Sequence, residues 1–189
     1  TTTEFRAAWV STFVSDIDQY KSEQAWKNEV ASVLKVFKEF NLNAMIFHVR
    51  THNNALYKSE LNPIASWWKY VDFDKFDPLE YLIDECHKRG MELHAWINPF
   101  RAQTASTKEL SPMHQISQPP DRFIKYGSLV LFNPAMQENC DHICKVAADI
   151  TRRYDIDGFH MDDYFLRPEQ RTPQRFAQPG GNVDRERFS

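Results

Sequence analysis

The stretch Asp155-Ile156-Asp157-Gly158-Phe159-His160-Met161-Asp162-Asp163-Tyr164 decides the fold. Its apolar residues predict a strand over residues 156–162 that ends in two adjacent carboxylates. Because side chains alternate along a strand, Phe159 and Met161 are expected on one face. The opposite face then carries His160 and Asp162. Polar side chains inside a domain are costly unless water, a partner or a ligand meets them, so Asp162 is the first candidate for chemistry.

Outward from this stretch, strand-like runs alternate with amphipathic helical runs. Strands are predicted over residues 5–12, 44–50, 92–97 and 156–162, with a short extra strand over 129–132. Helices are predicted over 22–40, from Asp77-Pro78 to Gly90, and from a cap at Asn133-Pro134 to about Tyr154. This order implies parallel strands joined by right-handed crossovers.

Two α/β architectures fit parallel strands, a barrel and an open doubly wound sheet. No Gly-rich turn follows the first strand, where a dinucleotide-binding sheet needs one. Polar residues instead follow each strand, at Thr12, Arg50, Asn98 and Asp162. Catalytic residues of α/β barrels lie at the carboxyl ends of the strands. The pattern therefore favours a (β/α)8 TIM barrel.

The strand count predicts only part of such a barrel. A complete barrel has eight strands, whereas this chain of 189 residues offers four principal ones. We expect residues 1–189 to form the N-terminal half of one barrel domain, with about four βα units. Long loops are expected near 51–76 and 98–128, and residues 167–189 read as a polar loop leading to a next helix. If these residues were the whole protein, two copies would have to pair to close the sheet.

Composition argues against several classes of protein. The net charge is −3 and the sequence has no basic block, so it does not predict a surface that binds nucleic acid. No apolar run is long enough to cross a bilayer. The cysteines have no zinc-type spacing and are interpreted as small buried apolar residues; they are Cys86, Cys140 and Cys144.

Aromatic residues make up 14% of the chain. Exposed rings stack on the apolar faces of sugars, and Tyr57, Trp67 and Trp68 are the candidates for this role. Trp67 and Trp68 lie in a Pro-containing loop, where local packing is the alternative.

Four regions in order resemble the glycosyl-hydrolase-like family 10 domain, a bacterial TIM-barrel group related to α-amylase-type glycosidases. They are FHVR (47–50) with NALY (54–57), HKRGMELHAWINPFR (87–101), NP (133–134) and YDIDGFHMDDYF (154–165). The resemblance implies a glycoside hydrolase acting on a polysaccharide or oligosaccharide. Residues 157–162 are also similar to the amylase motif Gly-Phe-Arg-x-Asp, which makes Asp162 the nucleophile and puts His160 where that motif has arginine.

The resemblance supplies half of an active site. The amylase-type general acid lies on the fifth strand, beyond this chain, so these residues alone are expected to be inactive. Glycoside hydrolysis commonly uses two carboxyl groups, but Asp162 and Asp163 are neighbours and point to opposite faces of a strand. Asp163 is therefore assigned to orienting Tyr164 or a nearby loop. The alternative for Asp162 is a cap on the following segment or an ion pair with Arg50.

Other polar residues at or near the strand ends complete the predicted substrate site. Arg50 is expected to hold a carboxylate in its ionised form, with a purely structural ion pair as the alternative. His94 and Asn98 are predicted to donate hydrogen bonds to sugar hydroxyls. His160, Tyr164 and Arg101 are placed at the same edge, where Arg101 is either a ligand or a solvated cation.

Two other functions remain open at this point. The first is a metal-dependent hydrolase on the same fold, for which the ligand candidates are His48, His52, His94, His160, Asp162 and Asp163. No HxH or HExxH spacing supports it, so we predict no metal and no cofactor. The second is a non-catalytic carbohydrate-binding or scaffold domain. The expected location is outside the cytoplasm of a bacterium, as a secreted, periplasmic or cell-surface protein.

Overall fold

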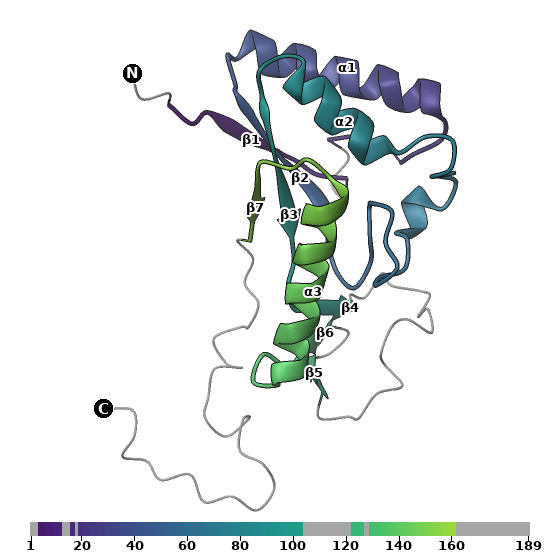
Figure 1. Ribbon diagram of the computed structural model, residues 1–189, viewed down its shortest axis with the longest axis vertical. Coiled ribbons are helices and arrows are strands. Elements are labelled where there is room, and N and C mark those ends of the chain that lie inside the picture. Colours follow the sequence, from purple (N-terminus) through teal and green to yellow (C-terminus); the bar gives the residue numbers. More distant parts are fainter. Residues whose placement is uncertain (1–3, 13–15, 18, 104–121, 127–128, 162–189) are drawn as a thin grey trace, which may run out of the picture.

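The protein is described by a computed structural model that covers residues 4–12, 16–17, 19–103, 122–126 and 129–161 (Figure 1). Its main sheet has four parallel strands in the order β1-β2-β3-β7. They are β1 (Ala7–Val10), β2 (Ala44–Arg50), β3 (Glu92–Ile97) and β7 (Gly158–His160). Helices α1 (Glu23–Glu39), α2 (Pro78–His87) and α3 (Gln137–Arg153) alternate with them along the chain. The predicted order of parallel strands and helices is confirmed.

Local signals set the ends of α1 and α2. The Ser22 hydroxyl accepts a hydrogen bond from the Ala25 amide (3.2 Å), and the Asp77 carboxylate accepts from the amides of Leu79 and Glu80. Gly90 then ends the α2 segment with φ of +67°, a conformation that glycine adopts without a Cβ penalty. No helix in the described part of the chain has both the length and the apolar character needed to cross a membrane.

Helix α3 begins later than predicted. Asn133 does not cap it, because its Oδ1 accepts from the Ala135 amide (3.0 Å) and its carbonyl accepts from the Met136 amide (3.2 Å). These bonds close a local turn, a competing use of asparagine that the sequence pattern does not distinguish from a cap. The helix starts at Gln137, so the predicted cap at Asn133-Pro134 is wrong.

A second, smaller sheet follows β3. Strands β4 (Arg101–Gln103), β5 (Phe123–Tyr126) and β6 (Leu129–Phe132) pair antiparallel in the order β4-β6-β5. Figure 1 shows it beyond the carboxyl ends of β2 and β3. It has its own core of Ala102, Val130 and Phe132. The predicted strand 129–132 is confirmed, but the expected loop near 98–128 contains two further strands.

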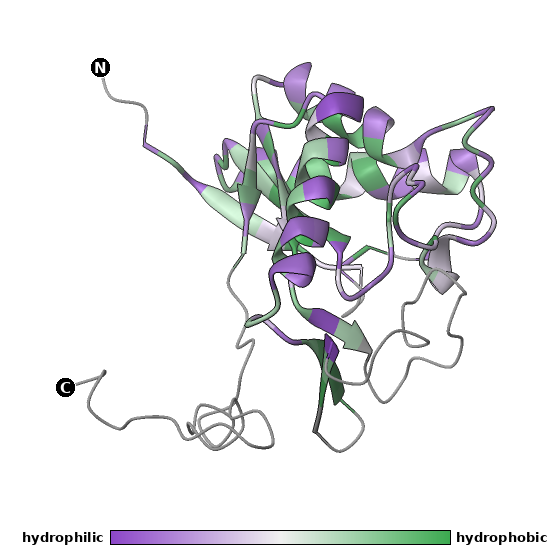
Figure 2. Ribbon diagram, turned by 60° about the horizontal axis from the view of Figure 1, so that its bottom comes forward, coloured by the Kyte–Doolittle hydropathy of each residue, from purple (hydrophilic) through white to green (hydrophobic). Residues whose placement is uncertain are grey.

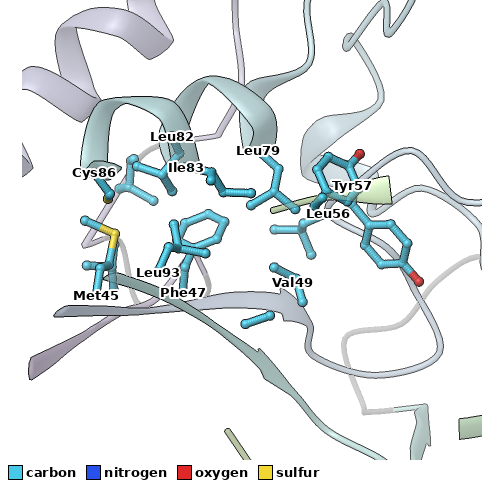
Figure 3. Packing of buried hydrophobic residues seen from close by; sticks show 14 of the residues in the cluster. Met45, Phe47, Val49, Leu56, Tyr57, Leu79, Leu82, Ile83, Cys86 and Leu93 are labelled. Atoms are coloured by element: carbon cyan, nitrogen blue, oxygen red, sulfur yellow. The ribbon is translucent and has the colours of Figure 1, made fainter. Parts of the chain in front are cut away.

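The main core lies between the sheet and its three helices. Met45, Phe47 and Val49 point from β2 towards α2, and Figure 3 shows them packed against side chains of that helix. Figure 2 shows the hydrophilic sides of the helices turned outward. Members of the same cluster from α1, α2, α3 and the other strands include Trp26, Leu34, Leu79, Leu82, Val146, Ile150, Leu93, Ala95 and Phe159.

The cysteines behave differently from one another. Cys86 is buried in this core, and burial raises the pKa of its thiol to about 12, as expected for an inert apolar residue. Cys140 is half-buried and Cys144 is exposed. The interpretation as a buried apolar residue is therefore confirmed for Cys86 and wrong for Cys144, which lies on the solvent side of α3.

The sheet is strongly curved. β1 and β7 are its two edges, so three inter-strand spacings, about 14 Å in a flat sheet, separate them. Nevertheless the Trp9 and His160 rings meet edge to face with centroids 5.5 Å apart. Phe5, just before β1, likewise contacts His94 of β3 at 5.2 Å. These contacts lie on the face opposite the helices, which is therefore the concave, inner face of the sheet.

Candidate functional site

A row of three side chains crosses the inner face near the carboxyl ends of the strands. His48, Trp96 and His160 are register partners on β2, β3 and β7, and we call them the His-Trp-His row. The His48 ring stacks on Trp96, with centroids 4.3 Å apart. This row places His160 on the inner face, as alternation predicts, while Phe159 packs against the helix-side core. The row was not predicted as a unit, because it depends on the register between the three strands.

One glycine lets the inner face pack closely. A Cβ atom on Gly158 would lie 2.7 Å from Nδ1 of His94, which is too close for any side chain. The other ring nitrogen of His94 lies 2.8 Å from the Glu92 carboxylate. His94 therefore has partners within the protein and lies four residues before Asn98. The predicted donation from His94 to a sugar hydroxyl stays a prediction.

Asn98 occupies the carboxyl end of β3 and organises the chain that follows. Its Oδ1 accepts hydrogen bonds from the amides of Phe100 (3.2 Å) and Arg101 (2.8 Å), and its side chain is buried. Arg101 is half-buried and begins β4. Asn98 thus turns the chain from the main sheet into the small sheet, and its predicted role as a hydrogen-bond donor to a ligand is untested.

Arg50 ends β2 and is fully buried. Its guanidinium donates to the Asn98 carbonyl and to Oδ1 of Asn53 (3.2 Å). Within the described ranges, no carboxylate lies within ion-pair distance of it. Burial lowers the pKa of Arg50 to about 10, so the group stays charged at neutral pH. The expected structural ion pair does not occur among these residues, and the side chain exposes no surface to a ligand.

Two of the three predicted stacking rings are core residues. Tyr57 and Trp68 are both 0% exposed, so neither offers a face to a sugar in this structure. The loop after β2 folds back on the sheet, with the Leu56 amide donating to the Val49 carbonyl (2.9 Å), and this non-local contact carries the rings inward. Trp67 is half-buried and packs against the same core. The expectation of sugar stacking is therefore corrected for Tyr57 and Trp68.

Tyr154 joins three segments behind this loop. Its hydroxyl donates to the Asp77 carboxylate (2.6 Å) and accepts from the Lys58 amide (2.7 Å). Burial and the neighbouring Asp77 carboxylate raise its pKa. Tyr154 was predicted only as the approximate end of a helix, because no local pattern identifies a contact that spans 77 and 96 residues.

The predicted nucleophile and its neighbours, Asp162, Asp163 and Tyr164, lie outside the described residues. The described chain reaches Met161, which directly follows β7 and is exposed, not packed with Phe159. β7 pairs with β3 through His160 and Trp96, so its carboxyl end lies at the same edge of the sheet as Asn98. Asp162 is the next residue in the sequence.

The described residues contain no group of three or more His, Cys, Asp or Glu side chains arranged to hold a metal ion. Among the six candidate ligands, His52 is buried with its Nδ1 3.1 Å from the Thr51 hydroxyl. The ring of Trp96 separates His48 from His160 within the row. The described part of the chain therefore gives the metal-dependent alternative no support.

Comparison with known proteins yields one family. The model of the family described as glycosyl hydrolase-like 10 matches residues 4–178. Glycosyl hydrolase YngK of Bacillus subtilis is 34% identical over 170 residues, which cover 86% of this chain and 33% of that protein. Glycosyl hydrolase DigH of Escherichia coli K12 is 31% identical over 140 residues, which cover 68% of this chain and 32% of that protein. The chain thus spans about a third of the length of these curated relatives.

Solved structures show the fold. A maltogenic alpha-amylase, AmyB of Thermotoga neapolitana, matches with a TM-score of 0.53 and 12% identity, over 86% of this chain and 39% of that one. A Paenibacillus cycloisomaltooligosaccharide glucanotransferase, complexed with cycloisomaltoheptaose, matches with a TM-score of 0.55 and 18% identity, over 87% and 24%. The four parallel strands and their helices are part of a TIM-type α/β barrel, as predicted.

Proposed function

The chain belongs to the glycosyl hydrolase-like 10 family, and from this premise we propose that it supplies part of the active site of a glycoside hydrolase. The substrate class is a polysaccharide or oligosaccharide. The observation that carries the proposal is the common edge formed by the carboxyl ends of β2, β3 and β7. In TIM barrels this edge holds the catalytic residues, and in this sequence Asp162 comes two residues after the last residue of β7.

Asp162 has the role of nucleophile in this proposal. An ionised carboxylate attacks the anomeric carbon, and the leaving oxygen takes a proton from a second carboxyl group. That second group is proposed to follow a later strand of the barrel. The inner face of the sheet is polar and aromatic next to the edge, with the His-Trp-His row beneath it, which suits contact with a ring that has both hydroxyl groups and apolar faces.

The test is Asp162→Asn in the full-length protein, assayed for hydrolysis of a panel of polysaccharides and their oligosaccharides. Loss of the attacking oxygen is expected to lower kcat/KM by about 1,000-fold or more. Asp155→Asn is the matched control, because its side chain is exposed before the start of β7 and its ion-pair partner among the described residues is His87. The control should keep wild-type turnover. Wild-type turnover by Asp162→Asn would refute the assignment of the nucleophile.

Titration calorimetry with the same sugars addresses the non-catalytic alternative. Tight sugar binding by the full-length protein without release of any product would favour a binding module over a hydrolase. Turnover that disappears on complete metal removal and returns on metal addition would favour the metal-dependent alternative.

A further inference from the structure

Arg50 holds the main chain of Asn98 from two directions. Its own carbonyl accepts from the Asn98 amide (2.7 Å), and its guanidinium donates to the Asn98 carbonyl. The pairing of β2 with β3 shifts register between His48 and Arg50, and such a shift redirects a side chain at the end of a strand. Arg50, at the end of β2, thus forms hydrogen bonds with both the amide and the carbonyl of Asn98, which follows the end of β3.

Burial of this charge is expensive. The buried Nε of Arg50 has no hydrogen-bond partner among the described residues, and no carboxylate there offsets the charge. The penalty for moving an ion out of water stays large even after the surroundings relax. An apolar residue of similar volume avoids that penalty, so packing alone does not account for an arginine at this position.

The bonds that Arg50 makes lead to the candidate site. Asn98, whose main chain it holds, orients the amides of Phe100 and Arg101 at the edge of the sheet. Asn53, its second acceptor, belongs to the loop that leaves the same edge after β2. Both segments leave the carboxyl edge of the sheet, and β3, which Asn98 follows, is the strand that pairs with β7.

We propose that Arg50 is a positioning residue of the active site, which fixes the ends of β2 and β3 and supplies a buried positive charge without touching the substrate. This role rests on the proposed glycosidase function and goes beyond it, since the sequence predicted direct contact with a ligand. Loss of this arrangement should lower the rate of the chemical step more than it weakens substrate binding, because a misplacement of about 1 Å can cost about 100-fold in rate.

The charged and titratable groups around Arg50 are few among the described residues. Tyr57 and His142 lie near enough to interact with its charge, and burial raises the pKa of Tyr57. Asp149 interacts with Tyr57 from α3 and is itself paired with Arg153. Arg122 and Lys145 add further positive charge around His142.

The experiment compares Arg50→Gln with Arg50→Lys in the full-length protein, using kcat, KM, the pH profile of kcat/KM and thermal unfolding. For Arg50→Gln we expect kcat to fall about 100-fold while KM stays within about threefold. The proposal also predicts that the acid limb of kcat/KM moves to higher pH in this variant, because the proposed positive charge favours the ionised form of the attacking carboxylate. Arg50→Lys keeps the charge and should restore the acid limb and part of kcat.

The matched control is Arg153→Gln, which removes a partly exposed cation of α3 that pairs with Asp149 and Glu60. It should leave kcat and the acid limb unchanged. If Arg50→Gln lowers only the unfolding temperature, or raises only KM, the positioning role is wrong. If Arg50→Gln does not fold, the test rests on Arg50→Lys. The proposal is overturned if Arg50→Lys keeps the wild-type kcat, whether or not the acid limb of its kcat/KM profile is displaced.

Asp162→Asn in the same assay tests the proposed nucleophile separately from the positioning role of Arg50. If Asp162→Asn keeps full turnover while Arg50→Gln loses kcat, the assigned nucleophile fails and the positioning role stands. If Asp162→Asn is inactive and Arg50→Gln is not impaired, the positioning role fails alone. A full-length wild type that hydrolyses no member of the sugar panel overturns both.

Discussion

The two faces of the four-stranded sheet differ in the side chains that they carry and in what those side chains contact. The helix side carries apolar side chains from alternate positions of each strand, closely packed against three helices. The inner face carries the intervening residues, among them His48, His94, Trp96 and His160. Neighbouring residues of one strand therefore serve different purposes. The helix side stabilises the fold, whereas the inner face and its edge hold the candidate chemistry, so substitutions on the two faces should have separable effects.

The largest effect is expected from Phe47→Ala on the helix side. Phe47 is 0% exposed and contacts the rings of Trp26 and Trp68. Removal of a buried aromatic ring should lower the free energy of unfolding by about 3–5 kcal/mol. Denaturant titration of the variant measures this. His48→Ala, one residue away on the inner face, is the matched control and should cost less than half as much; equal losses would refute the proposed separation of the faces.

A smaller effect is expected from Gly158→Ala, which adds one methyl group to the inner face. The new Cβ would lie 2.7 Å from the His94 ring, which Glu92 and Phe5 hold in place. The clash should cost about 1–3 kcal/mol of unfolding free energy. The double variant Gly158→Ala with His94→Ala removes the clash and should recover part of the loss. If the loss in the double variant equals the sum of the losses in the two single variants, the close approach is not the cause.

The smallest effect is a pH dependence at the contact between α3 and the small sheet. His142 of α3 packs against Phe132 (5.9 Å), and burial together with Arg50, Arg122 and Lys145 lowers its pKa from 6.5 to about 4. Between these values the unfolded chain binds a proton that the folded chain does not. Stability from this residue is therefore present above pH 6.5 and is lost as the pH falls towards 4.

His142→Phe should remove this dependence, so its unfolding temperature should fall less between pH 7 and pH 5 than that of the wild type. Thermal unfolding at the two pH values measures the difference. His87→Phe is a suitable comparison, because that histidine lies between the Asp155 and Asp157 carboxylates instead of cations. An identical pH response of wild type and His142→Phe would contradict the prediction.

Local patterns allowed much of the fold to be predicted. The predicted ranges 44–50, 92–97 and 129–132 coincide with β2, β3 and β6, and caps at Ser22 and Asp77 set the starts of α1 and α2. Contacts between distant segments were not predictable. Residues 101–103 and 123–126 pair only with β6, and both lie within a long polar stretch predicted as a loop, although Phe123, Ile124 and Tyr126 are residues that favour strands.

The same limit applies to the candidate site. Strand ends placed Arg50, Asn98 and His160 at or next to one edge of the sheet, since that placement follows from alternation and parallel order. Burial of Tyr57 and Trp68 depends on a loop that folds back on β2, and the environment of Arg50 depends on a register shift. Neither the path of this loop nor the register shift can be predicted from the spacing of residues in the sequence. Asp162, the residue with the sharpest prediction, lies beyond the described chain.

The hydroxyl of Tyr154 has a consequence for how the chain folds. It ties the start of α2 and the loop after β2 to a residue at the end of α3, across 77 and 96 residues of sequence. Successive strand–helix units that closed only on their immediate neighbours would fold stepwise, with mainly local contacts. Here the loop after β2 and the start of α2 reach their final hydrogen bonding only when α3 docks. The amide of Lys58 should therefore exchange its hydrogen with the same opening free energy as α3, as one cooperative unit.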